Sequence, residues 1–166
     1  MSEIKPLRVL FVCHGNICRS PAAEGAFLKL IQDRNLADQF EVDSAGTSSF
    51  HVGERPHADT RKAAREVGIT LNSLARQFRF DDFDRFDWII AMDHKNRKDI
   101  FALSNSSEQT DKVILFRGFD PEGKDLDVPD PYYGDFDGFQ EVQQIVSRTA
   151  KELLDFFLSG KATASK

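Results

Sequence analysis

Apolar and β-branched residues occur in short runs, separated by longer stretches with a helical repeat. A continuous apolar run that stops at glycine, proline or polar residues is typical of a strand buried on both faces. The chain contains such runs at residues 8–12, 40–45, 88–91 and 112–116. We therefore predict four strands at these places.

The stretches between and after these runs predict helices. Apolar residues recur at helical spacing over residues 20–34, where Ser20 can cap the helix and the proline after it suits the first helical position. Residues 59–67 contain good helix formers, Asp93 can cap a further helix, and residues 135–158 carry the longest apolar stripe. Strands that alternate with helices predict an α/β fold, a parallel sheet with helices on both faces, whose site lies at the carboxyl ends of the strands.

Length, charge and composition narrow the class of protein. The chain has 166 residues, 40% hydrophobic and 30% charged, which fits one globular domain. We expect that domain over residues 1–160, followed by a disordered tail at 161–166. The formal net charge of −5 argues against a nucleic-acid partner. No apolar run is long enough for a signal peptide or a membrane span, so we expect a cytoplasmic protein with no membrane partner, acting as a monomer.

The loop after the first predicted strand carries the strongest candidate chemistry. It joins the carboxyl end of a strand to the start of a helix and reads Cys13-His14-Gly15-Asn16-Ile17-Cys18-Arg19. Backbone N–H groups in such a turn, together with the positive end of the helix, form a cradle for an anion such as phosphate. The helix end and Arg19 both favour the thiolate of Cys13, which makes it a nucleophile. The alternative, a buried and inert thiol, would require the spacing to Arg19 to be accidental.

Arg19 and Ser20 complete the predicted phosphate-binding loop. The planar guanidinium of Arg19 can hold two phosphoryl oxygens, a geometry that lysine cannot reproduce, and can stabilise the charge of the transition state. Ser20 can donate a hydrogen bond to the cysteine sulfur or simply cap the helix. Neither the Walker motif nor Gly-x-Gly-x-x-Gly occurs, so a nucleotide phosphate bound through those motifs is not expected.

Hydrolysis of a tyrosine phosphate also requires an acid, because a phenol with a pKa near 10 leaves poorly as phenolate. Asp130 is the best candidate, since the prolines on both sides of it restrict the backbone and deny helix. An isolated Asp-Pro dipeptide more often marks a turn than a catalytic acid. In this chain the motif from Cys13 to Arg19 favours the catalytic interpretation. The carboxyl group could protonate the leaving group and then activate water, which is covalent catalysis without a metal or cofactor. Tyr132 and Tyr133 would wall the pocket.

These residues resemble the signatures of a known family. Cys-x-Gly-Asn-Ile-Cys-Arg-Ser-Pro, starting at Cys13, and Asp-Pro-Tyr-Tyr-Gly-Asp, starting at Asp130, are similar to the two signatures of the low-molecular-weight protein tyrosine phosphatases. Similar segments fall between them, at residues 43–45, 75–77 and 91–93, so the resemblance covers nearly the whole chain. It implies a flavodoxin-like three-layer fold with a four-stranded parallel sheet. It also implies a phosphotyrosine-containing protein as substrate and inorganic phosphate as product.

The resemblance further implies roles for single residues. Cys13 would be the nucleophile, Arg19 the phosphate clamp, and Asp130 the acid and then the base. The other implied roles are loop support by Asn16, Ser20 and Ser44, a substrate pocket rim of Phe50, Tyr132 and Tyr133, and a redox partner for the nucleophile at Cys18. A small apolar filler explains Cys18 equally well.

Two positions depart from the family pattern. Ser73 stands where many relatives carry a histidine that braces the loop, which predicts that the loop is supported differently in this chain. His14 replaces an apolar residue that is common in eukaryotic members, and it could alter the basicity of the sulfur or the access of the substrate. Neither departure removes a reacting group.

Three alternative functions use the same motifs. An arsenate reductase of this fold needs further cysteines to pass on a disulfide, and the chain has none beyond Cys18. Arginine phosphatases resemble this sequence with threonine in place of Ile17, and isoleucine there should obstruct that chemistry. A module that binds phosphotyrosine without turnover is disfavoured because Cys13, Arg19 and Asp130 are all present.

Overall fold

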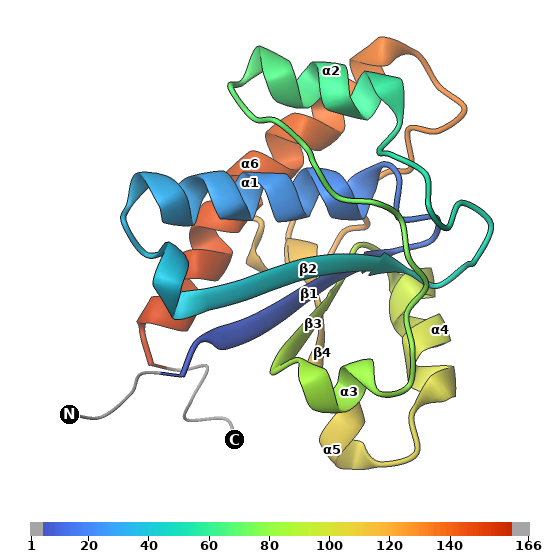
Figure 1. The fold of residues 1–166 in the computed structure, drawn as a ribbon, viewed down its shortest axis with the longest axis vertical. Helices are drawn as coiled ribbons and strands as arrows, with labels where there is room; N and C mark the ends of the chain where they lie inside the picture. The colour runs from blue at the N-terminus through green and yellow to red at the C-terminus, as the bar shows by residue number, and fades with distance from the viewer. Residues whose placement is uncertain (1–4, 161–166) are drawn as a thin grey trace.

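A four-stranded parallel sheet forms the centre of the computed structural model, which describes residues 5–160 (Figure 1). The strands lie in the order β2-β1-β3-β4 and comprise β1 (Leu7–Cys13), β2 (Phe40–Gly46), β3 (Trp88–Ala91) and β4 (Val113–Leu115). The predicted four-stranded parallel sheet is therefore confirmed, in flavodoxin-like order. The strand order reverses between β1 and β3, and the carboxyl ends of strands at such a switch point are where open α/β sheets bind ligands. The predicted tail at 161–166 lies outside the described residues.

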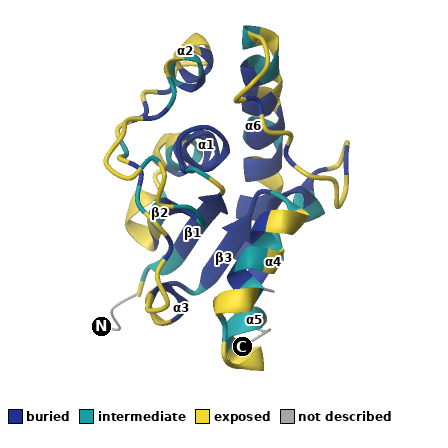
Figure 2. Ribbon diagram, turned by 90° about the vertical axis from the view of Figure 1, so that its right-hand side faces the viewer, coloured by how far each residue is buried: buried dark blue, intermediate teal, exposed yellow. Residues whose placement is uncertain are grey.

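Helices cover both faces of this sheet, as predicted. They are α1 (Arg19–Asp33), α2 (Ala58–Glu66), α3 (Asp82–Arg85), α4 (His94–Leu103), α5 (Ser107–Thr110) and α6 (Phe136–Leu158), with 3₁₀ turns at Ala37–Gln39 and Phe116–Phe119. Helices α1 and α6 pack on one face with α2 outside them, and α3 and α4 pack on the other. Figure 2 shows buried residues on the sheet and on the inward sides of α1 and α6. No helix within residues 5–160 has the length and apolar composition needed to cross a bilayer.

Two hydrophobic cores explain why β1 reads as one unbroken apolar run. Successive side chains of a strand point to opposite faces of its sheet. Val9 and Phe11 enter the core under α1 and α6, whereas Leu10 and Val12 enter the core under α3 and α4. Each large side chain buried in this way stabilises the fold by about 1.5–3 kcal/mol. The strand that carries Cys13 is therefore anchored from both sides.

Three local predictions were wrong. Pro21, predicted at the first helical position, is the third residue of α1. The fourth strand ends at Leu115 rather than at Phe116, because the chain turns there and Phe116 packs edge-on against Phe11 with the ring centroids 5.6 Å apart. Ser20 does not cap α1, because the helix already begins at Arg19 and Ser20 lies inside its first turn. The predicted cap at Asp93 is confirmed, since its carboxylate accepts the backbone N–H of Asn96 at 2.6 Å.

Candidate active site

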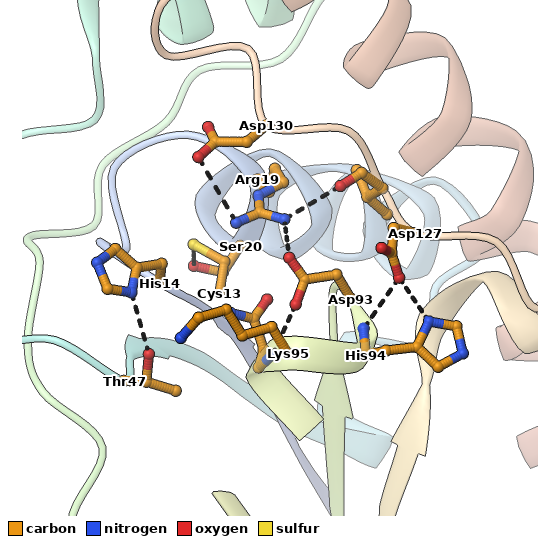
Figure 3. Close-up of polar contacts among 12 residues, drawn as sticks. Cys13, His14, Arg19, Ser20, Thr47, Asp93, His94, Lys95, Asp127 and Asp130 are labelled. Atoms are coloured by element: carbon orange, nitrogen blue, oxygen red, sulfur yellow. Dashed lines mark hydrogen bonds and ion pairs between the residues drawn. The ribbon is translucent and has the colours of Figure 1, made fainter. Parts of the chain in front are cut away.

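Cys13 is the last residue of β1, and its sulfur lies at the base of the loop that leads into α1 (Figure 3). The side chain is buried. The backbone N–H of Asn16 donates to the sulfur at 3.3 Å, and the hydroxyl oxygen of Ser20 lies 3.0 Å from it. Donors directed at a sulfur stabilise its charged form. The loop thus directs a backbone N–H at the sulfur, and Ser20 faces that sulfur instead of capping the helix.

Asn16 holds the bend of this loop. Its φ of 58° lies in the left-handed region, which costs a residue with a side chain about 1–2 kcal/mol. The side-chain amide compensates with three hydrogen bonds. Its Nδ2 donates to Ser20 Oγ at 2.7 Å and to Ser44 Oγ at 3.0 Å, while its Oδ1 accepts the backbone N–H of Arg76 at 3.0 Å. All three residues predicted to support the loop, Asn16, Ser20 and Ser44, therefore lie in one buried network.

The end of β2 lies directly against the loop. The backbone N–H groups of Thr47 and Ser48 donate to the carbonyls of Cys13 and His14, both at 2.9 Å. A Cβ atom at Gly46 would lie only 2.6 Å from the carbonyl oxygen of His14, so only glycine permits this approach. His14 points outward, with its Nδ1 3.5 Å from the hydroxyl of Thr47.

Arg19 is buried beside the sulfur at the first position of α1. Its Nη1 donates to Asp93 Oδ2 at 2.6 Å and to the carbonyl of Val128 at 3.0 Å, and its Nη2 lies 3.9 Å from Asp130 Oδ2 (Figure 3). Burial alone would lower the pKa of Arg19, but the nearby sulfur of Cys13 and the carboxylate of Asp93 raise it instead. The guanidinium therefore stays charged and fixed in place.

Asp130 reaches the site from the irregular segment between the 3₁₀ turn at Phe116–Phe119 and α6. One carboxylate oxygen accepts the backbone N–H of Tyr132 at 3.2 Å, which holds the side chain in a short local turn. The other oxygen is the one that lies near Arg19. About half of the side chain, 51%, is exposed, so a proton on Asp130 can exchange with solvent.

A pocket of about 290 Å³ joins these groups. It is lined by Cys13, Arg19 and Asp130, by most of the predicted phosphate loop, and by all three predicted rim residues, Phe50, Tyr132 and Tyr133. Phe50 is 80% exposed and Tyr133 is 94% exposed, which places two large aromatic side chains at the mouth. Asn16, Ser20 and Ser44 do not line the pocket and lie behind its wall.

His51 lines the same pocket, although no role was assigned to it from the sequence. Its Nδ1 lies 2.9 Å from Glu54 Oε2, and its ring centroid lies 4.8 Å from that of Phe50 and 5.9 Å from that of Tyr132. A Cβ atom at Gly15 would lie 3.0 Å from the His51 ring, so the histidine packs closely against the loop. The only signal in the sequence was its position next to Phe50.

Cys18 is buried next to the pocket and, like Cys13, is a free cysteine. Burial raises the pKa of its thiol to about 12, although a hydrogen bond with the Thr60 side chain acts in the opposite direction. Cys18 is therefore an uncharged thiol at neutral pH and does not compete with Cys13 as a nucleophile. Its part in a reversible disulfide stays a prediction.

Glu24 takes part in supporting the loop in this chain, which carries Ser73 where many relatives carry a histidine. The hydroxyl of Ser44 donates to Glu24 Oε1 at 2.6 Å, and the side chain of Ser73 also forms a hydrogen bond with this carboxyl group. From the sequence alone, a glutamate in the first turns of a helix is expected to face solvent. Its burial depends on the segment around Ser73, which is distant in the sequence.

The segment that carries Asp130 is anchored at its start by a buried ion cluster. Asp120 accepts hydrogen bonds from Arg117 Nε at 2.8 Å and from Arg148 Nε and Nη2 at 2.9 and 3.0 Å. Arg117 also donates from Nη1 to the carbonyl of Asp127 at 2.9 Å. Burial alone would raise the pKa of Asp120, but the hydrogen bonds from Arg148, the backbone of Glu122 and Arg117 lower it to about 2.

Comparison with known proteins identifies close relatives across nearly the whole chain. Residues 8–163 match the family model described as low molecular weight phosphotyrosine protein phosphatase. A rat protein of that name is 40% identical over 156 residues, which is 93% of this chain and 98% of the rat protein. A low molecular weight protein-tyrosine-phosphatase of Streptomyces coelicolor is 42% identical over 149 residues, covering 89% of this chain and 91% of its own length. A protein tyrosine phosphatase structure from Entamoeba histolytica superposes with a TM-score of 0.90 at 37% identity, covering 93% and 99% of the two chains.

Proposed function

The chain belongs to the low molecular weight phosphotyrosine protein phosphatases, and from that membership we propose specific roles for the residues of its pocket. As a member of the family, the protein is a phosphatase that hydrolyses phosphotyrosine. One observation carries the assignment of roles: Cys13, Arg19 and Asp130 line a single pocket, with 3.9 Å between Arg19 Nη2 and Asp130 Oδ2.

In the first step, the thiolate of Cys13 attacks the phosphorus atom and the bond to the tyrosine oxygen breaks. Asp130 donates its proton to that oxygen, so that a neutral phenol leaves, and such a positioned acid contributes about 10²- to 10⁴-fold in rate. Both hydrogen bonds that Arg19 makes to other described residues use Nη1, which leaves Nε and Nη2 for two phosphoryl oxygens. Backbone N–H groups of the loop bind the remaining charge.

In the second step, water attacks the cysteinyl phosphate and the sulfur leaves as a thiolate. Asp130, now a carboxylate, accepts a proton from the water. Inorganic phosphate is the product, and both Asp130 and Cys13 return to their starting states. Ser20, 3.0 Å from the sulfur, stabilises the departing thiolate.

The shape of the pocket supports tyrosine phosphate as the preferred substrate group. The aromatic side chains at the mouth, Phe50 and Tyr133, can flank a phenyl ring while its phosphate reaches the loop. Ile17 contributes an apolar wall, which suits an aromatic ring better than the strongly polar guanidino group of phosphoarginine. We propose a phosphotyrosine-containing protein as the substrate. A monomeric state and a cytoplasmic location remain predictions.

The proposal is tested by substituting the nucleophile. We expect Cys13→Ser to lose at least about 10⁴-fold in turnover of an aryl phosphate, while inorganic phosphate still binds because the loop amides and Arg19 are unchanged. Cys18→Ser is the matched control, and we expect it to retain turnover. Turnover by Cys13→Ser at the wild-type rate would refute the assignment of the nucleophile.

Parallel assays with phosphotyrosine, phosphoarginine and arsenate test the substrate class. We expect turnover of phosphotyrosine to exceed that of phosphoarginine, and no arsenate reduction, because the chain contains only two cysteines. Faster turnover of phosphoarginine would replace the proposed substrate. Binding of phosphotyrosine without turnover by the wild-type chain would indicate a binding module instead of an enzyme.

A further inference from the structure

The side chain of Tyr132 contacts two histidines of the segment that joins β2 to α2. Its ring centroid lies 5.8 Å from that of His57, in an edge-to-face contact of 73°, and 5.9 Å from that of His51, with the planes tilted by 47°. Asp130 precedes Tyr132 by two residues and accepts its backbone N–H at 3.2 Å. The contacts of Tyr132 therefore bear on the position of the acid.

His57 is itself fixed by three contacts. Its backbone N–H donates to the carbonyl of Ile17 in the phosphate loop at 2.8 Å. Its Nδ1 accepts the backbone N–H of Asp59 at 3.0 Å and so caps α2. Its ring stacks on that of Phe139 in α6, with the centroids 4.7 Å apart and the planes at 25°. Tyr132 thus packs against a ring that is held to the phosphate loop and to two helices.

A second support of the acid rests on the same histidine. Pro131, next to Asp130, is buried, and a Cβ atom at Gly138 would lie 3.6 Å from the Cβ of Pro131. Gly138 immediately precedes Phe139, the residue on which His57 stacks. The chain on the carboxyl side of Asp130 is therefore held at two points, and the ring of His57 stands behind both.

His57 does not take part in the chemistry directly. It does not line the active-site pocket, whereas Tyr132 and Asp130 do. Its Nδ1 is used by the cap of α2, and one face of its ring is covered by Phe139. An effect of this ring on turnover has to reach the reaction through the side chains that it contacts.

We propose that His57 is a positioning residue whose ring keeps Tyr132, and with it the carboxyl group of Asp130, in place to protonate the leaving phenol. The inference rests on the role proposed above for Asp130. Among residues 5–160, the only other polar contact of this carboxylate is its 3.9 Å approach to Arg19 Nη2, which is longer than a hydrogen bond. Loss of the ring displaces the acid and slows the step that needs it, while the nucleophile is unchanged.

Two substitutions of His57 separate its ring from its cap. His57→Asn keeps an oxygen that can accept the N–H of Asp59, since asparagine is a favoured N-cap, but it lacks the ring. His57→Phe keeps a ring that can pack against Tyr132 and Phe139, but it cannot cap the helix. A purely structural role would make activity follow the cap, whereas the proposal makes activity follow the ring.

The measurement is kcat/KM on two aryl phosphates, one that releases a phenol with a pKa near 10 and one that releases a more acidic phenol. We expect the loss in His57→Asn to be about threefold to tenfold larger on the first substrate than on the second, which needs no acid. His57→Phe should keep the wild-type ratio of the two kcat/KM values. Its Tm should nevertheless fall by about 2–4 °C, because the cap is lost.

Asp130→Asn shows whether the effect passes through the acid. This substitution should give a larger selective loss of the same kind, and adding His57→Asn to it should change the ratio no further. Tyr132→Leu removes the contact from the other side and should behave like His57→Asn, which keeps the test decisive if His57→Asn does not fold.

Equal losses on the two phosphates in His57→Asn and Tyr132→Leu overturn the inference. A selective loss in His57→Phe as large as that in His57→Asn, or a further selective loss in the Asp130→Asn background, also overturns it. If Asp130→Asn alone still discriminates between the two phosphates, the assignment of the acid stands even then.

Discussion

The phosphate loop and the segment that carries Asp130 meet at one pocket but are held in place in different ways. The loop from Cys13 to Arg19 is buried except at His14 and Gly15, and side-chain hydrogen bonds from α1 and β2 fix it. The segment with Asp130 is anchored at its start by Asp120 and its arginines, while Asp130 itself is half exposed.

This difference follows from what each group has to do. A nucleophile and its phosphate clamp gain from donors that are already oriented before the substrate arrives, since no reorganisation is then needed during the reaction. An acid that later acts as a base must exchange protons with solvent, and the rim beside it must admit the substrate. The two regions also use buried carboxyl groups in opposite ways. Asp120 is ionised between two arginines, and Glu24 has hydrogen bonds without an ion pair.

Of the substitutions in these two regions, loss of the acid Asp130 should lower turnover the most. We expect Asp130→Asn to lower kcat on phosphotyrosine about 10²- to 10⁴-fold, because the phenol then has to leave unprotonated. For an aryl phosphate with an acidic phenol, the rate of the first step should fall much less, because such a phenol leaves without being protonated. Asp135→Asn, on the same segment, serves as the control. An equal loss in the first step on both substrates would remove Asp130 from the role of acid.

Disruption of the anchor should mainly affect stability. Asp120→Asn leaves the buried guanidinium of Arg117 without its carboxylate, and breaking a buried pair in this way costs about 3 kcal/mol. Urea unfolding at neutral pH would measure this change. Glu122→Gln, which affects only the exposed partner of Arg148, should change the free energy of unfolding by less than about 0.5 kcal/mol. Equal effects of the two substitutions would contradict the anchoring role.

The pH dependence of stability should distinguish the two buried carboxyl groups. The pKa of Glu24 is about 7 in the folded chain against an ordinary value of 4.5, so the folded state retains this proton longer and loses stability as the pH rises between these values. Glu24→Gln removes this loss and should gain about 3 kcal/mol relative to the wild type between about pH 4 and pH 8. For Asp120, with a pKa of about 2, stability is instead lost as the pH falls below its ordinary value of 3.8. A constant difference between Glu24→Gln and the wild type would contradict this account of Glu24.

Truncation of the rim should have the smallest effect. Phe50 is exposed and contacts the ring of His51, so Phe50→Ala removes only one side of the aromatic mouth. We expect KM for a phosphotyrosine peptide to rise about threefold to tenfold, with little change in kcat, because stacking of this kind contributes about 1 kcal/mol. Val52→Ala, exposed two residues further on, is the control. A large fall in kcat with unchanged KM would place Phe50 in the chemical step instead.

The phosphate loop could be predicted from the sequence because its chemistry lies within one short segment. Cys13, Asn16 and Arg19 are brought together by a single strand-to-helix turn, and a pattern over seven residues is enough to indicate it. The sheet was predictable for a related reason, since strands buried on both faces are continuous apolar runs. The 3₁₀ turns and the shortest helices were not predicted, because a few residues do not establish a helical period.

The supports of the two loops could not be predicted, because they join residues that are far apart in the sequence. Asp93 was expected only to cap α4, and its bond to Arg19 spans 74 positions. Asp120 lies in an acidic segment of the sequence, and its partner Arg148 is 28 positions away. Burial and ion pairing of this kind follow from packing, and no local pattern encodes them.

In the mechanism that we propose, phosphate is transferred to Cys13 before water removes it. Asp130→Asn, mixed with an aryl phosphate of an acidic phenol, lacks the base for the second step but can still perform the first. Acid quenching followed by peptide mass spectrometry should then find one phosphoryl group per chain, on Cys13. Release of phenol and phosphate with no phosphorylated Cys13, or with the phosphoryl group on another residue, would contradict the account.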